Sequence, residues 1–296
     1  MNVTEEMLAN WSRPPSETEE DRCRNAVRAV ADAVKGEFGN DVDIFLQGSY
    51  RNRTNVRRDS DVDIVVRHNK YCFTDSSRLP LFDQPKVRNH YPFVTYTFEE
   101  FKSSVHNILH KEFGSDASRE NKCIRLSENS YRVKADVVPV FEYYILRQPH
   151  EPQHSGTCMF ADDKKSEIIY SFPQQHYDNG VAKNGRTAES YKGLVRILKR
   201  IRNRMIEEGV LDENGMPSFF LECLVWNMPD DTFQHAKWED ILRSFLVKVY
   251  NDMKNPLSPV RYTEANAIKP LFTQVAGRTP EKASTFTTAV WQYLGL

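Results

Sequence analysis

The feature that most constrains this chain is a Gly-Ser pair that precedes an Asp-x-Asp pair at a short distance. Eleven residues separate Gly48 and Ser49 from Asp61 and Asp63. The residues at 42–47 are typical of a strand, and the six residues from Asp61 onward are typical of a second strand with alternate apolar positions. The local pattern therefore predicts a strand, a turn, a short helix and another strand.

This pairing of motifs suits a nucleotide and its metal ions. Side chains alternate between the faces of a strand, so Asp61 and Asp63 share one face, where two adjacent carboxylates repel unless a cation lies between them. Oxygen ligands suit Mg²⁺, which keeps part of its shell for water and substrate phosphates. Gly48 allows a backbone turn to approach a phosphate, and Ser49 can donate its hydroxyl and N–H to phosphate oxygens. The alternative is a solvated surface, where acidic pairs are common.

A third carboxylate is needed if two metal ions are to bind the attacking and leaving oxygens of a phosphoryl transfer. The best candidate is Asp136, in a segment whose alternation predicts a strand over residues 131–140. Arg132 and Lys134 would share its face, which is also the pattern of an ordinary surface ladder of charges. Both interpretations stay open from this segment alone. Pro139 predicts the end of a strand or a sheet edge.

Together, the Gly-Ser, Asp-x-Asp and later Asp-Val-Val-Pro elements resemble the nucleotidyltransferase superfamily that is built on a polymerase-β-like palm. Within it, the chain most resembles the bacterial cGAS/DncV-like nucleotidyltransferases (CD-NTases), relatives of cyclic GMP-AMP synthase and oligoadenylate synthase. The resemblance extends from about Gln47 to about Asn227 and is weaker at both ends. It implies an α+β fold, in which a mixed sheet with flanking helices forms the palm, a helical C-terminal lobe follows, and the nucleotide cleft lies between them.

Two further segments support the CD-NTase group. Residues 187–202 are similar to the central helix of that family, in which a lysine at the position of Lys199 holds the donor triphosphate. Residues 216–222 resemble the start of the next helix, where Ser218 would also meet the triphosphate. By resemblance, two Mg²⁺ ions, for which Mn²⁺ can substitute, would be held by Asp61, Asp63 and Asp136. Asp136 would also help to activate the attacking 3′ hydroxyl. The predicted nucleotide- and phosphate-binding residues are Gln47, Gly48, Ser49, Lys192, Lys199 and Ser218.

The helix that carries Lys199 is also predicted by its own pattern. Thr187 is a good N-cap, and Gly209 can close the C-terminus. Lys192, Arg196 and Lys199 lie on one face at spacings of four and three. Such a stripe is usually a solvated face, but beside three carboxylates and a phosphate loop it would neutralise a triphosphate. Apolar positions three or four residues apart predict the buried side: Tyr191, Leu194, Leu198, Ile201 and Met205.

The composition limits the partners and the location of the protein. Of 296 residues, 40% are hydrophobic and 27% are charged, which is ordinary for a soluble globular protein. There is no apolar run that could span a membrane and no secretory pattern at the N-terminus, so we expect a cytoplasmic protein without a membrane partner. The formal net charge of -1 argues against a long nucleic acid as partner. Five scattered cysteines without zinc spacing predict reduced thiols and no zinc module.

The remaining segments indicate how the chain is organised. Residues 68–96 contain three prolines and are predicted as a loop-rich insertion, whereas Thr97 and Glu100 form a capping-box pattern before a helix. Residues 148–187 are rich in proline and glycine and are predicted as a mobile stretch. After that stretch the pattern is mainly helical. The predicted domains are an N-terminal brace helix and palm in residues 1–165, and a helical lobe that completes the nucleotide cleft in residues 166–296.

The predicted activity is metal-assisted nucleotidyl transfer between NTPs, in which a 3′ hydroxyl attacks an α-phosphate in line and pyrophosphate leaves. By resemblance, the linear dinucleotide is joined again to give a cyclic di- or trinucleotide. Such a product would be a second messenger in CBASS-type antiviral defence, where a downstream effector binds the product. ATP is the expected substrate, and UTP, GTP and CTP are further candidates. Two alternatives stay open: a transferase that modifies an antibiotic, a protein or an RNA end, and a noncatalytic nucleotide-binding scaffold.

Overall fold

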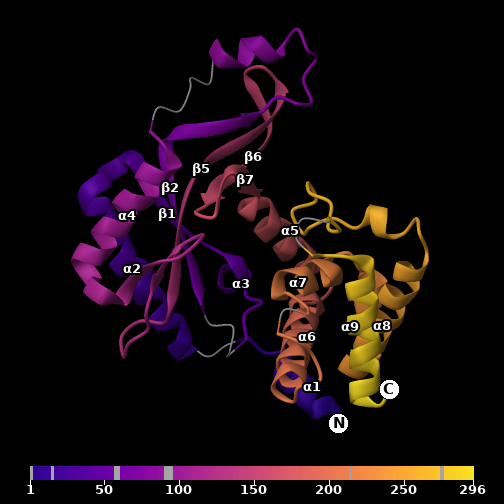
Figure 1. The fold of residues 1–296 in the computed structure, drawn as a ribbon. Coiled ribbons are helices and arrows are strands. Elements are labelled where there is room, and N and C mark those ends of the chain that lie inside the picture. The colour runs from indigo at the N-terminus through magenta and orange to yellow at the C-terminus, as the bar shows by residue number, and fades with distance from the viewer. Residues whose placement is uncertain (1–2, 15–16, 57–60, 90–95, 214, 274–276) are drawn as a thin grey trace. The chain divides into compact units, whose positions relative to one another are not determined.

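Helices and strands form two units, each with its own packing, in the computed structural model shown in Figure 1. The sheet unit takes residues 16–50 and 60–173, and the helical unit takes residues 1–15, 51–59 and 174–296. The predicted domain boundary after residue 165 remains a prediction. The structure describes residues 3–14, 17–56, 61–89, 96–213, 215–273 and 277–296.

The sheet unit is built on seven strands within the described ranges. Their order is β1-β2-β5-β4-β3, and β6 and β7 continue the sheet from the far part of β5. The central pair, β2 and β5, is parallel, whereas the other pairings are antiparallel. The mixed sheet that the family resemblance implies is therefore confirmed. The bounds are β1 Val42–Gln47, β2 Val62–Asp75, β3 Ala117–Arg119, β4 Ile124–Leu126, β5 Ala135–Gln148, β6 Glu151–Ala161 and β7 Lys164–Ser171.

Two long helices pack against this sheet (Figure 1). Helix α2 (Glu17–Phe38) contacts β1, and α4 (Phe98–Phe113) contacts β5 and α2. The ring of Phe101 in α4 stacks on Phe141 in β5, with 5.5 Å between the ring centroids. The predicted capping box at the start of α4 is confirmed, since the side chains of Thr97 and Glu100 each bond to the other's backbone N–H. The cap and the aromatic contact fix the position of α4 on the sheet.

Helix α6 (Ser190–Glu207) forms the centre of the helical unit. The five apolar positions that were predicted to be buried are each at most 1% exposed, and burial of one such Leu or Ile side chain contributes about 1.5–3 kcal/mol. Gly209 follows the helix with a φ of +69°, as expected for a residue that ends it. The other helices of this unit are α1 Glu5–Trp11, α5 Pro173–Arg186, α7 Ser218–Trp226, α8 Trp238–Lys254 and α9 Pro280–Leu294. The short helices of the chain are α3 Gly48–Arg51, η1 Gly39–Asp41, η2 Gln84–Asn89, η3 Gly114–Asp116, η4 Asp230–Phe233 and η5 Pro259–Arg261.

The N-terminal helix α1 belongs to the helical unit. Leu8 and Trp11 are buried in its apolar core, and α1 contacts α6 and α8. The carboxylate of Glu5 accepts the backbone N–H groups of Trp238 and Glu239, at 2.8 and 3.1 Å. Since these N–H groups begin α8 and have no partner within the helix, Glu5 caps that helix from a distant part of the sequence.

Two segments that were predicted to be irregular are regular structure. Strand β2 continues to Asp75, so the predicted loop-rich insertion is wrong for residues 68–75, because its prolines come only after the strand. The predicted mobile stretch at 148–187 is also wrong, since it holds β6, β7 and all of α5. Pro152 is tolerated inside β6 because it lies opposite Leu146, where the register of the β5–β6 pairing shifts.

Three local boundaries also differ from prediction. Helix α6 begins at Ser190, so Thr187 is not its N-cap, although its hydroxyl still accepts the backbone N–H of Tyr191 at 3.2 Å. Strand β5 begins at Ala135, so the first four residues of the predicted strand lie outside it. Pro139 lies inside β5, not at its end. On one side of β5, the partner strand changes from β4 to β6 near Pro139. Since neither strand pairs with Pro139 on that side, the missing N–H of proline costs no hydrogen bond there.

Two expectations about the whole chain concern membranes and thiols. Across the part of the chain that the structure describes, no helix has both the length and the apolarity needed to cross a bilayer. All five cysteines are free thiols.

Candidate active site

Strand register brings two of the predicted acids together. In the parallel pairing of β2 and β5, Asp63 lies opposite Asp136. On its other side, Asp63 lies opposite Gln47 at the end of β1, and Asp136 lies opposite Arg125 in β4. Paired residues on neighbouring strands project to the same face of a sheet. Four strands therefore contribute one row of polar side chains: Gln47, Asp63, Asp136 and Arg125.

This row borders a pocket of about 240 Å³ within the sheet unit. It is somewhat smaller than typical small-molecule sites, which occupy about 300–1,000 Å³. Gln47, Asp63 and Asp136 supply its polar wall, and the hydroxyls of Thr157 and Ser171 bond to each other at 3.1 Å in another part of the lining. The pocket thus has carboxylates at one wall and a mixed surface elsewhere. The remaining lining residues are Lys122, Cys123, Val138, Val140, Cys158, Met159 and Ile169.

Gly48 lies directly against Asp63. Its φ of +71° is in the left-handed region, and a Cβ atom there would come within 2.0 Å of the Asp63 carboxylate oxygen Oδ2. Glycine is therefore required both by backbone conformation and by space. Ser49 follows in the single turn of α3, as the predicted turn and short helix require. The structure thus places the Gly-Ser turn beside the second acid of the Asp-x-Asp pair.

Asp61 and Asp136 each contact a basic side chain. Lys134 Nζ donates to Asp61 Oδ2 at 2.7 Å, and Arg125 Nε donates to Asp136 Oδ1 at 3.3 Å. Arg125 and Lys134 are both more than one third exposed, so neither ion pair is sealed from water. Burial, together with the negative charge of Asp136, raises the pKa of the Cys123 thiol to about 12. The thiol is therefore protonated at neutral pH.

The donor set fits Mg²⁺ by its chemistry, since carboxylate oxygens are the hard ligands that this ion takes. Asp63 and Asp136 are in register, and Asp61 precedes Asp63 by two residues. In the described ranges, no three His, Cys, Asp or Glu side chains converge closely enough to hold a metal ion. In the structure, Lys134 forms an ion pair with Asp61, and Arg125 forms an ion pair with Asp136.

The other predicted phosphate-binding residues belong to the helical unit. Lys192 and Lys199 lie in α6 and are 8% and 1% exposed, and Ser218 is the first residue of α7. Gln47, Gly48, Ser49 and the three acids belong to the sheet unit. The basic stripe of α6 is therefore not a solvated face, and that alternative interpretation is wrong.

The members of this basic stripe have different surroundings. Arg196 donates to the backbone oxygens of Ser12 and Arg53. It therefore connects α6 to the residue that follows α1 and to the segment that follows α3. Burial lowers its pKa to about 10, which still leaves it charged at neutral pH. Lys192 Nζ lies 5.8 Å from the centre of the Tyr177 ring, and burial lowers its pKa as well. Arg196 thus has an architectural role that its place in the stripe did not reveal.

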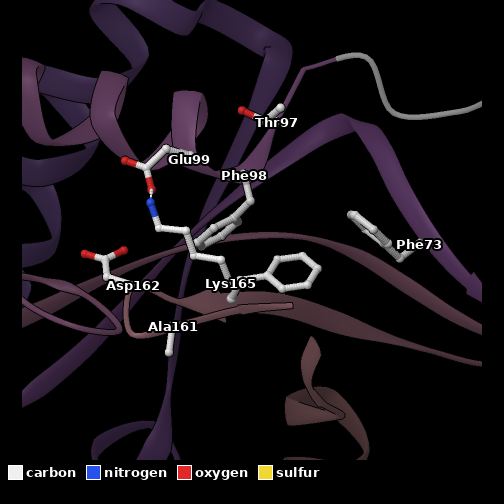
Figure 2. A pocket seen from close by; sticks show the side chains of 8 residues that line it. Phe73, Thr97, Phe98, Glu99, Ala161, Asp162 and Lys165 are labelled. Atoms are coloured by element: carbon white, nitrogen blue, oxygen red, sulfur yellow. Dashed lines mark ion pairs between the residues drawn. The ribbon is translucent and has the colours of Figure 1, made fainter. Parts of the chain in front are cut away.

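A second pocket of about 260 Å³ lies elsewhere in the sheet unit, beside the N-terminus of α4 (Figure 2). Aromatic rings line much of it, among them Phe73 and Phe98. Its polar rim contains the ion pair of Lys165 with Glu99, at 3.3 Å, and Asp162, which Arg119 binds at 2.9 Å. It shares no lining residue with the first pocket, and none of the predicted site residues lines it.

Several residues that line the first pocket or lie beside its carboxylates could not be found from the sequence. Arg125 belongs to a three-residue strand whose register with β5 places it beside Asp136, and so short a strand has no periodic pattern. Thr157 and Ser171 lie in the stretch that was predicted to be mobile. The alternation around residues 131–140 offered one usable signal, because it singled out Lys134, which contacts Asp61.

Two known families together match most of the chain. A family described as the cGAS/DncV-like nucleotidyltransferase C-terminal helical domain matches residues 178–295, and the nucleotidyltransferase domain family matches residues 27–153. The chain is 42% identical over 295 residues to the cyclic dipurine nucleotide synthase of Elizabethkingia meningoseptica, with 100% of this chain and 99% of the relative covered. It is 33% identical over 300 residues to the cyclic dipyrimidine nucleotide synthase CdnE of Cecembia lonarensis, with 98% of each covered.

Solved structures extend the similarity to three dimensions. The structure of the Elizabethkingia meningoseptica CdnE cyclic dinucleotide synthase with GTP and Apcpp superposes with a TM-score of 0.84 at 40% identity, and the alignment covers 100% of both chains. Sequence and fold therefore agree over the full length of the described protein.

Proposed function

Because this chain belongs to the cGAS/DncV-like nucleotidyltransferase family, we propose that it joins two NTPs into a cyclic dinucleotide with release of pyrophosphate. The chain is a nucleotidyltransferase with the polymerase-β-like fold of this family. Similarity to relatives that are named as cyclic dinucleotide synthases supports cyclisation over the alternative of modifying an antibiotic, a protein or an RNA end.

One observation from the structure carries the proposal for the site. The register of β2 and β5 sets Asp63 beside Asp136, both of which line the pocket, and the side-chain-free Gly48 lies against Asp63. A glycine turn and two adjacent carboxylates at the wall of a pocket are features of a nucleotide-metal site. A scaffold without catalysis would have no need to keep these carboxylates adjacent.

Each residue would have a defined task. Asp61, Asp63 and Asp136 would hold Mg²⁺, which when bound neutralises phosphate charge and lowers the pKa of the acceptor 3′ hydroxyl. Asp136 would accept a hydrogen bond from that hydroxyl, and the backbone at Gly48 and Ser49 would bind phosphate oxygens. Lys199 would neutralise the donor triphosphate, with Lys192, Ser218 and Gln47 as further polar contacts.

We assign purine nucleotides as substrates. The relative that is named as a cyclic dipurine nucleotide synthase is 42% identical to this chain, whereas the two that are named as dipyrimidine synthases are 33% and 35% identical. The structure of that first relative is described with GTP and an ATP analogue. ATP and GTP are therefore the first pair to test, ahead of UTP and CTP.

The biological role follows from the nature of such a product. A cyclic dinucleotide would serve as a diffusible second messenger, and a downstream effector would bind the product and not the enzyme. We propose antiphage defence as the setting. Its test is phage challenge of cells that carry the enzyme together with its effector, in which loss of Asp63 should abolish protection.

The activity is tested directly with labelled nucleotides. The protein is incubated with Mg²⁺ and all four NTPs, treated with phosphatase, and the resistant products are identified by mass spectrometry. We expect a cyclic dinucleotide that contains only purines. The lack of any resistant product with either Mg²⁺ or Mn²⁺ would contradict cyclisation, and a pyrimidine product would contradict the assigned substrates.

A matched pair of variants ties that activity to the site. Asp63→Asn should lower product formation by about 100-fold or more, because loss of even an outer partner of a metal ligand costs 10–100-fold. Asp43→Asn is the control, since Asp43 lies in the neighbouring strand β1 and pairs with Arg67 at the surface. Equal activity of the two variants would remove Asp63 from the site.

A further inference from the structure

Glu222 is a buried carboxylate in the helical unit that was not predicted from the sequence. It lies in α7 and is 4% exposed. Three side chains donate to it: Thr54 Oγ1 and His176 Nε2 at 2.9 Å, and Asn52 Nδ2 at 3.2 Å. Lys199 Nζ lies 4.0 Å from the same carboxylate, so it interacts by charge. Two donors lie in the segment that follows α3, one lies in α5 and the lysine lies in α6.

The charge on Glu222 is stable despite its burial. Burial alone raises the pKa of a carboxyl, but the hydrogen bonds from His176 and Thr54 and the positive charges of His176 and Lys199 outweigh it and lower the pKa to about 2. Glu222 is therefore a carboxylate throughout the physiological range. A buried carboxylate of this kind holds its partners strongly, since each would otherwise lose a bond in a low dielectric.

We propose that Glu222 is a positioning residue that holds Lys199 in place for the triphosphate of the donor nucleotide. The inference rests on the proposed function, in which Lys199 binds that triphosphate. Glu222 itself touches neither substrate nor metal in this assignment and acts through Lys199.

Two features of the surroundings support this role. Lys199 is 1% exposed, and burial of a positive charge is costly unless a negative charge lies close to it, as Glu222 does at 4.0 Å. Ser218, the other predicted triphosphate contact of this unit, precedes Glu222 by four residues in α7 and so lies on the same face of that helix. Ser218 thus lies about one helical turn from the carboxylate that contacts Lys199.

The test measures binding of the nonhydrolysable ATP analogue α,β-methylene ATP by calorimetry. Glu222→Gln keeps the shape of the side chain but removes its charge, and it should weaken the affinity by about tenfold, as expected for loss of one interaction with a charged group. Glu264→Gln is the matched control. Glu264 is also 4% exposed in the helical unit, but it pairs with Arg278 at 2.9 Å. Its variant should bind the analogue with an unchanged affinity.

An equal effect of the two variants would overturn the inference, because it would reduce Glu222 to a generic buried acid. The double variant Glu222→Gln with Lys199→Ala should bind no more weakly than Lys199→Ala alone. Additive losses would show that Glu222 acts elsewhere, and this also would overturn the inference.

A second variant covers the case in which Glu222→Gln does not fold. Thr54→Val removes one donor to Glu222 at constant size and should weaken the affinity for the analogue by about two- to fivefold. An unchanged affinity would contradict the inference. The product assay is separate: failure to form a cyclic product would reject the proposed function, while the binding data would still decide the role of Glu222.

Discussion

The carboxylates of the sheet unit and the carboxylate of the helical unit are neutralised in different ways. Asp61 and Asp136 contact Lys134 and Arg125, which are more than one third exposed. Glu222 is enclosed and has three hydrogen-bond donors and Lys199 around it. The partly exposed side chains of Lys134 and Arg125 can move away and leave room for a metal ion or a substrate. The buried donors around Glu222 are held in place by the fold. The difference matches the proposed roles, in which the acids of the sheet unit hold metal ions and Glu222 positions Lys199.

The largest expected effect is a difference in the free energy of unfolding between a variant of Glu222 and a variant of Asp136. Glu222→Ala would leave Lys199 and His176 buried without their carboxylate, and it should lower the free energy of unfolding by about 3–5 kcal/mol. Asp136→Ala removes only a partly exposed ion pair and should change this free energy by at most about 1 kcal/mol, while it abolishes product formation. Urea unfolding and the product assay measure both. A large stability loss for Asp136→Ala would break the comparison.

The pH dependence of stability should sharpen the comparison between Glu222 and the acids of the sheet unit. The pKa of Glu222 is lowered from 4.5 to about 2 in the folded state, so its contribution is complete above pH 4.5 and is lost as the pH falls towards 2. Over that range the contribution amounts to about 3 kcal/mol. The difference in unfolding free energy between the protein and its Glu222→Gln variant should therefore shrink from pH 6 to pH 3. A difference that stays constant would mean that the folded protein does not favour the charged form.

A pair of glycine variants probes the sheet site with a smaller effect. Gly48→Ala introduces a methyl group that meets the carboxylate of Asp63, in a backbone conformation that itself costs about 1 kcal/mol or more. We expect both lower stability and a strong loss of product formation. Gly39→Ala has a similar φ of +56° but open space around the new methyl group, so it should lose stability alone. If both variants kept full activity, the approach of Gly48 to Asp63 would have no catalytic role.

The smallest effect is expected at Lys134. Lys134→Ala removes an ion pair whose side chains are 38% and 44% exposed, and it should change the unfolding free energy by less than about 1 kcal/mol. Thermal unfolding at low and high salt measures this change. A larger loss of unfolding free energy that does not change with salt would contradict this expectation. It would show that the Lys134–Asp61 pair stabilises the fold as strongly as the buried contacts of Glu222.

Elements with a strong local pattern could be predicted from the sequence. The apolar spacing of α6, the cap of α4 and the strand before Gly48 were all recognised, because each depends on residues close in the chain. Strands β6 and β7 were missed. Pro152 and Gly156 of β6 are typical of a loop, but the pairing of β6 with β5 accommodates both.

The two sites were predictable to different degrees for the same reason. Asp61 and Asp63 are two residues apart, so their shared face could be inferred directly. The partners of Glu222 come from Asn52, Thr54 and His176, and only the tertiary fold brings these residues to it. No spacing rule connects positions so far apart in the chain.

The helical unit is assembled from three separate stretches of sequence, and this has a consequence for how the chain is made. Leu8 and Trp11 leave the ribosome well before α6 and α8, the helices that their own helix contacts. The sheet unit, whose strands all precede residue 174, can form in the meantime. Helix α1 is thus synthesised long before the helices on which it packs, and its removal would expose the apolar core of the helical unit.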